Sequence, residues 1–68
     1  MFEVTFWRDG VEKTIAEKFD TMQDALDYAR DGVEYREHGK YWYDEALILD
    51  MEDYSTTFVT RTGVSGTF

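Results

Sequence analysis

Alternating apolar and polar positions over residues 2–19 predict a β-hairpin. The dipeptide Asp9-Gly10 is typical of a type I′ turn, and it lies between two runs rich in β-branched and aromatic residues. A two-residue loop sets a register with these pairs: Arg8 with Val11, Phe6 with Lys13, and Val4 with Ile15. One face of the hairpin is then apolar on both strands. Its members are Phe2, Val4, Phe6, Val11, Ile15 and Phe19. The other face is mostly polar, with Trp7 as the exception.

After this hairpin, apolar and acidic residues each recur with the period of an α-helix. Thr21 and Asp24 are spaced as in a capping box, which places the start of the helix at Met22. At roughly 100° per residue, the helix has an apolar stripe and, opposite to it, an acidic stripe. The apolar stripe consists of Met22, Ala25, Leu26, Ala29, Gly32 and Val33. The acidic stripe consists of Asp20 (just before the helix), Asp24, Asp27, Asp31 and Glu34.

Gly32 raises the question of where the helix ends. Both stripes continue through position 32 without a break in phase, which predicts one helix over residues 22–37 with Gly39 as its stop. Gly32 then faces the core, where its missing side chain lets the helix approach the sheet at a cost of about 1 kcal/mol relative to alanine. The alternative ends the helix at Gly32 and makes residues 33–37 a strand.

The C-terminal part of the chain predicts a second hairpin over residues 45–62. Residues 46–49 are apolar on both faces, which indicates a strand inside the sheet. The stretch "TTFVTRT" is rich in β-branched residues and predicts the next strand. Residues 63–68 contain two glycines and no charge, so we expect a loose tail.

These elements predict one two-layer α+β domain over residues 1–68, with the order ββαββ. One helix covers one face of a four-stranded antiparallel sheet. The strand order 2-1-3-4 places the third strand between the first and the fourth, in agreement with its two apolar faces.

Composition narrows the possible partners. The 68 residues contain 15 acids against seven Lys and Arg, for a net charge of -8, and there is no cysteine. Disulfides and zinc–thiolate sites are therefore excluded, and direct binding to nucleic acid or to an anionic membrane is disfavoured. The charge favours a protein partner with a basic surface; the alternative is that it only keeps the domain soluble. No apolar run approaches the roughly 20 residues of a transmembrane helix, and the N-terminus lacks the features of a signal peptide, so we expect a cytoplasmic protein.

Catalytic motifs are missing from the sequence. The two serines that lie in a predicted turn and tail, Ser55 and Ser65, have no nucleophile-elbow motif around them. His38 lies at the predicted helix end, where a favourable interaction with the helix dipole accounts for a histidine without a catalytic role. A calcium loop starting at Asp50 lacks the required glycine and the final acid. We therefore expect no enzyme activity, no metal and no cofactor.

The candidate site is an acidic-aromatic surface. Tyr28 and Tyr35 lie seven residues apart and border the acidic stripe. Tyrosine and tryptophan are enriched at binding hot spots. The residues expected to contact a partner are Asp24, Asp27, Tyr28, Asp31, Glu34, Tyr35, Trp42 and Tyr43. In the alternative, the two helical tyrosines lean over the edge of the sheet and the acids are merely solvated.

The function expected from these features is that of a small acidic, non-catalytic protein-binding module. It would dock its acidic-aromatic face on a basic surface of a larger protein. In a sharper version of this hypothesis, the partner is a nucleic-acid-binding protein whose groove the acids enter as a nucleic-acid mimic. Small acidic chains without cofactors are common among phage-encoded inhibitors, which is an analogy of size and composition. The alternative is a structural subunit or homodimer that associates through an aromatic sheet face.

Overall fold

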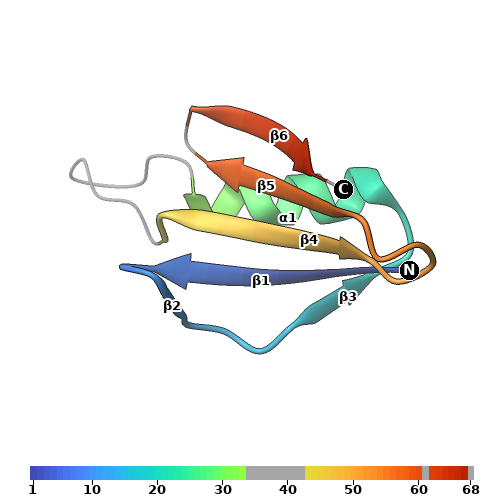
Figure 1. Cartoon of the computed structure of the whole chain (residues 1–68), viewed down its shortest axis with the longest axis horizontal. Coiled ribbons are helices and arrows are strands. Elements are labelled where there is room, and N and C mark those ends of the chain that lie inside the picture. The colour runs from blue at the N-terminus through green and yellow to red at the C-terminus, as the bar shows by residue number, and fades with distance from the viewer. Residues whose placement is uncertain (34–42, 61, 68) are drawn as a thin grey trace.

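The computed structural model describes residues 1–33, 43–60 and 62–67 of the chain. Its elements, in chain order, are β1 (Phe2–Arg8), β2 (Val11–Glu12), β3 (Glu17–Phe19), α1 (Met22–Val33), β4 (Glu45–Asp50), β5 (Thr56–Thr60) and β6 (Gly63–Thr67). In the described part of the chain the strands form one antiparallel sheet, and α1 packs on one face of it (Figure 1). The predicted α+β class with a single helix is confirmed.

The predicted position of the third strand is also confirmed. The sheet has the order β2-β1-β4-β5-β6, and β3 also pairs with β1. Strand β4 lies between β1 and β5, so that Ile48 is paired with Val4 on one side and Thr57 on the other. The predicted four-strand sheet differs in detail, because the second predicted strand is split into β2 and β3 and because β6 adds a strand.

The predicted hairpin register holds only near the turn. Asp9 and Gly10 both have positive φ values, 54° and 77°, as a type I′ turn requires. Arg8 pairs with Val11 as expected. Farther along, however, Val4 pairs with Glu17 instead of Ile15, so the predicted pair is wrong by two residues.

Residues 13–16 account for this shift, because they leave the strand between β2 and β3. The side-chain oxygen of Thr14 accepts a hydrogen bond from the backbone N–H of Phe6 at 3.1 Å. Ile15 is 88% exposed, so its predicted place on the apolar face is wrong. The shifted register instead places Phe19 opposite Phe2, which packs an aromatic ring against the core in place of Ile15.

The prediction of a loose tail over residues 63–68 is wrong for residues 63–67, which form β6. Its register with β5 pairs Ser65 with Phe58 and Val64 with Val59. Ladder hydrogen bonds come from the backbone, so small uncharged residues can extend a sheet even though their side chains do not predict a strand.

The helix continues through Gly32, as predicted, and is described up to Val33; residues 34–37 of the predicted helix lie outside the described residues. At its start, the backbone N–H of Asp24 donates to the side-chain oxygen of Thr21 at 3.2 Å, which confirms Thr21 as the N-cap. A Cβ placed on Gly32 would lie 2.5 Å from Cζ of Phe6. The predicted close approach of helix and sheet is therefore confirmed.

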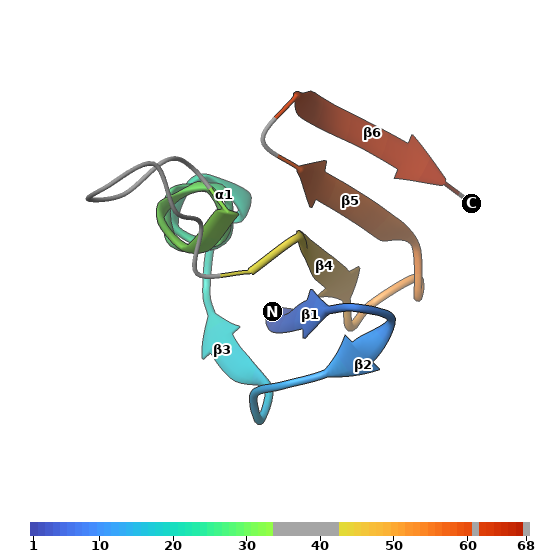
Figure 2. The same ribbon diagram turned by 90° about the vertical axis from the view of Figure 1, so that its left-hand side faces the viewer.

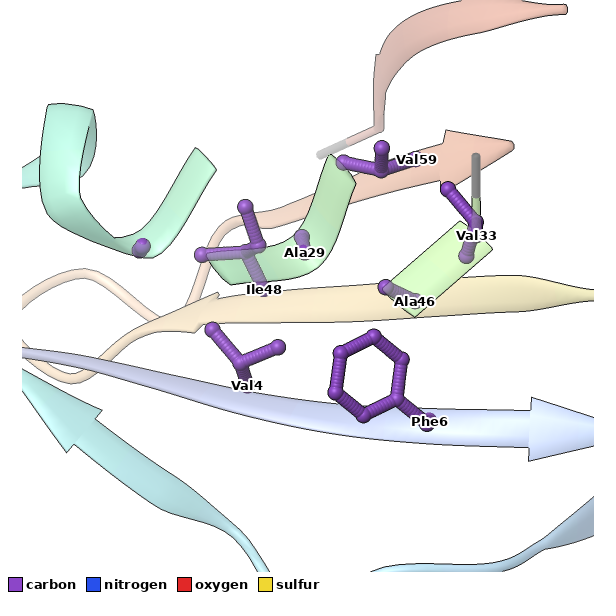
Figure 3. Packing of buried hydrophobic residues seen from close by; sticks show 8 residues of the cluster. Val4, Phe6, Ala29, Val33, Ala46, Ile48 and Val59 are labelled. Atoms are coloured by element: carbon purple, nitrogen blue, oxygen red, sulfur yellow. The ribbon is translucent and has the colours of Figure 1, made fainter. Parts of the chain in front are cut away.

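The core lies between α1 and the inner face of the sheet (Figure 3). Its buried members are Val4, Phe6, Ala25, Ala29, Val33, Ala46, Ile48 and Val59. Two of the three buried helical residues are alanines, which keeps the helix close to the strands. Within the described residues, no helix has the length and apolar character needed to cross a bilayer.

Candidate protein-binding surface

The helix acidic stripe, defined here as Asp24, Asp27 and Asp31, lies on the outer side of α1. All three side chains are exposed, whereas Ala25 and Ala29 on the opposite side are buried. The amide of Gln23 donates to Oδ1 of Asp27 at 2.9 Å. The helical period thus places three carboxylates on one outward surface, where they can meet cationic side chains of another protein.

Tyr28 combines a packed ring with an exposed edge. Its ring centroid lies 5.3 Å from that of Phe6 and 5.0 Å from that of Phe19, and the residue is still 36% exposed. Tyr28 therefore leans over the β1–β3 edge, as the alternative interpretation of the sequence has it. Partial burial raises the pKa of the Tyr28 phenol, and the nearby Glu17 carboxylate and Tyr43 raise it further.

Tyr43 belongs to the same aromatic cluster and comes from the segment before β4. Its ring stacks on Phe6 with centroids 4.7 Å apart and planes 16° apart. Its backbone N–H donates to the carbonyl oxygen of Gly32 at 3.1 Å. Tyr43 is half-buried, and its backbone and ring together link Gly32 of α1 to Phe6 of β1.

The structure thus brings together part of the predicted site. Asp24, Asp27, Tyr28 and Asp31 share α1, and Tyr43 contacts Phe6, the ring that Tyr28 also contacts. The remaining predicted residues, Glu34, Tyr35 and Trp42, lie outside the described residues.

The β4–β5 turn forms a second acidic-aromatic surface, which the predicted set of site residues did not contain. Tyr54 is 71% exposed and has a positive φ of 60°, and its neighbours Glu52 and Asp53 are exposed. From the sequence, Glu52 and Asp53 belong to a predicted acidic turn, and they were considered there as metal ligands and not as partner contacts. An exposed tyrosine beside acids was the available signal.

Hydrogen bonds hold this turn in one conformation. The backbone N–H of Tyr54 donates to the carbonyl oxygen of Asp50 at 2.8 Å, and Oδ1 of Asp50 accepts from the N–H of Glu52 at 2.9 Å. Oδ1 of Asp53 accepts from the N–H of Ser55 at 2.9 Å. The backbone and side-chain hydrogen bonds from Ser55 lower the pKa of Asp53. Among the described residues, no group of three acids or histidines is arranged to hold a metal ion.

The sheet face opposite α1 carries a half-buried apolar row. Leu47 at its centre is paired with Thr5 on β1 and Phe58 on β5, and residues paired in this way point to the same face. Trp7 belongs to this face, and its indole N–H donates to the hydroxyl of Thr5 at 3.3 Å. Within the described residues, no segment covers this face (Figure 2).

The chain matches no protein-family model, no curated protein and no solved structure in the comparisons made.

Proposed function

We propose that this chain is a non-catalytic protein-binding module that docks its helix acidic stripe on a basic surface of a larger protein. The observation that carries the proposal is the exposure of Asp24, Asp27 and Asp31 along one side of α1, directly opposite its buried side. The exposed edge of Tyr28 borders this stripe.

Charge and the aromatic edge make different contributions to such binding. The net charge of -8 attracts a basic partner over a distance and raises the association rate. Single exposed ion pairs contribute only about 0–1 kcal/mol each, so an anchor with a larger contact area is also needed. The Tyr28 ring is already held by Phe6 and Phe19, so it loses little conformational freedom when a partner covers its edge.

In its sharper form, the proposal is that the stripe acts as a nucleic-acid mimic, in the manner of a phage-type inhibitor. Side chains three and four residues apart on a helix lie about 5–6 Å from each other, which is close to the spacing of phosphates along one strand. A groove lined with Arg and Lys can accept such a row of carboxylates, and nucleic acid is then excluded from the groove by competition.

Affinity capture from the lysate of the source cell tests the proposal with matched charge variants. Asp27→Lys and Asp31→Lys each place a cation in the stripe, and we expect each to reduce capture of the partner by about tenfold or more. Glu12→Lys on β2 changes the net charge by the same amount at an exposed position away from α1, and we expect it to retain most of the binding.

Two further readouts complete the experiment. High salt should weaken capture, because it screens exposed charges, and added duplex DNA or RNA should release the partner if the stripe occupies a nucleic-acid groove. The proposal fails if Glu12→Lys reduces capture as much as Asp27→Lys, if capture does not depend on salt, or if the chain captures only itself.

A further inference from the structure

The two edges of the sheet differ sharply in how they are protected. At one edge, β2 and β3 are short and separated by residues 13–16, which leave the strand. This edge also carries the charged residues Glu12, Lys13, Glu17 and Lys18. Short strands, irregular backbone and charges are the devices that prevent edge-to-edge pairing of sheets.

The other edge is β6, which has none of these devices along Gly63–Thr67. Its five residues include no charge and no proline, and it pairs with β5 along its whole length. In an antiparallel ladder, alternate residues direct their N–H and C=O groups away from the neighbouring strand. In the described part of the chain no other strand pairs with β6, so these outward groups can accept a further strand.

Charge makes β6 the edge at which two copies of this chain repel each other least. All 15 acids lie at or before Asp53, and Arg61 is the one charged residue after it. Each copy carries a net charge of -8, so close approach elsewhere brings carboxylates together. Approach through β6 brings together two stretches that contain no acid.

We propose that β6 is a self-association site, at which β6 of one chain pairs antiparallel with β6 of a second copy and joins the two sheets into one. Such an interface is related by a two-fold axis, with the same strand on both sides. The β2–β3 edge is protected against pairing, so the assembly closes as a dimer. The inference is independent of the proposed function, because α1 lies on a face of the sheet and stays accessible.

Sedimentation velocity of the full chain, from micromolar to millimolar concentration, tests this dimer. We expect the fraction of dimer to increase with salt, because salt screens the repulsion between the two negative copies. Binding to a basic partner should weaken with salt, so failure of one proposal is distinguishable from failure of the other.

Variants at Ser65, the exposed middle residue of β6, separate edge pairing from a general effect of charge. Ser65→Lys makes the net charge less negative, which by itself would favour association. At a paired edge it brings like charges close to each other. Like charges juxtaposed across an interface oppose binding strongly, so we expect the dimer dissociation constant to increase by about tenfold or more. Ser65→Thr adds no charge and suits a strand, so we expect it to retain the dimer.

Amide exchange measured by NMR locates the interface in the same samples. We expect amides within residues 63–67 to exchange more slowly as the dimer fills. The proposal is overturned if the chain stays monomeric at millimolar concentration in high salt, if Ser65→Lys dimerises as well as Ser65→Thr, or if dimerisation instead shifts the resonances of Trp7 and Leu47, which lie on β1 and β4, away from β6.

Discussion

Gly32 of α1 and the ring of Phe6 on β1 meet without room for a Cβ between them. A Cβ on Gly32 would lie 2.5 Å from Cζ and 3.0 Å from Cδ1 of Phe6. The same ring is stacked on Tyr43 and tilted against Tyr28, so neighbouring rings restrict its movement away from the helix. The distance between helix and sheet at this end of the core therefore depends on a glycine.

Gly32→Ala should lower the free energy of unfolding, although alanine is the better helix former by about 1 kcal/mol. The added methyl group forces either the Phe6 ring or the helix to move, and overpacking of this kind costs about 1–3 kcal/mol. Urea unfolding followed by circular dichroism measures the change.

Phe6→Leu provides the matched background for this test, because leucine lacks the outer ring atoms that a Cβ on Gly32 would meet. There Gly32→Ala should be neutral or stabilise by up to about 1 kcal/mol. Stabilisation by Gly32→Ala with Phe6 intact would contradict the close approach.

Thr14 should contribute more to the stability of the domain than Ile15, although Ile15 is the more apolar of the two residues. Thr14→Val removes the oxygen that accepts the N–H of Phe6, and we expect a loss of about 1 kcal/mol. Ile15→Ser changes an exposed side chain, so the free energy of unfolding should stay within about 0.5 kcal/mol of wild type. A larger loss for Ile15→Ser than for Thr14→Val in urea unfolding would restore the predicted register.

Tyr28 should make the domain less stable in alkali. Its pKa is raised in the folded chain, so the folded state holds the phenolic proton more tightly than the unfolded state. Stability from this group is present below the usual tyrosine pKa of about 10 and is lost as the pH rises through the folded value.

Tyr28→Phe removes this titration while keeping the ring. We expect the free energy of unfolding of wild type to fall relative to that of Tyr28→Phe as the pH is raised from about 8 to about 11. The other tyrosines are common to both proteins and should largely cancel in the difference. Parallel curves over this range would show that Tyr28 does not carry the effect.

Asp53 should have the opposite dependence, at acid pH. Its pKa is lowered by hydrogen bonds from Ser55, so its contribution to stability is present above the usual aspartate pKa of about 3.9 and is lost as the pH falls through the folded value. Asp53→Asn should be less stable than wild type at neutral pH, and the two should converge in acid. Glu52→Gln, which removes one charge from the same turn, is the control; equal losses for both variants would assign the effect to net charge.

The helix, the central strand and the close approach at Gly32 could be predicted from the sequence, because each follows from the spacing of apolar and polar residues along the chain. The hairpin register was not accessible in this way. A shift of two residues leaves every side chain on the same face, so alternation cannot decide whether Ile15 or Glu17 lies opposite Val4. The decision depends on the Thr14 hydroxyl and on the packing of Phe19, which are tertiary contacts.

The candidate surface could also be predicted only in part. The outward position of Asp24, Asp27 and Asp31 follows from the helical period. The lean of Tyr28 toward Phe6 and Phe19 depends on how rings pack, which spacing does not encode. Strand β6 was missed because glycine, which occurs twice in it, is depleted in strands. Its pairing with β5 uses backbone N–H and C=O groups, and every residue except proline has both.

The central position of β4 has a consequence for the order of folding. Strands β4, β5 and β6 follow one another with short connections, so their pairing closes only small loops. Strand β4 must also pair with β1, where Phe2 meets Asp50 and Trp7 meets Glu45, and this closes a loop that contains the whole helix. Contacts so distant in the chain slow folding, because the loop entropy is lost before they form. The buried layer is complete only when the first strand reaches the fourth, so the two ends of the chain are expected to fold and unfold together.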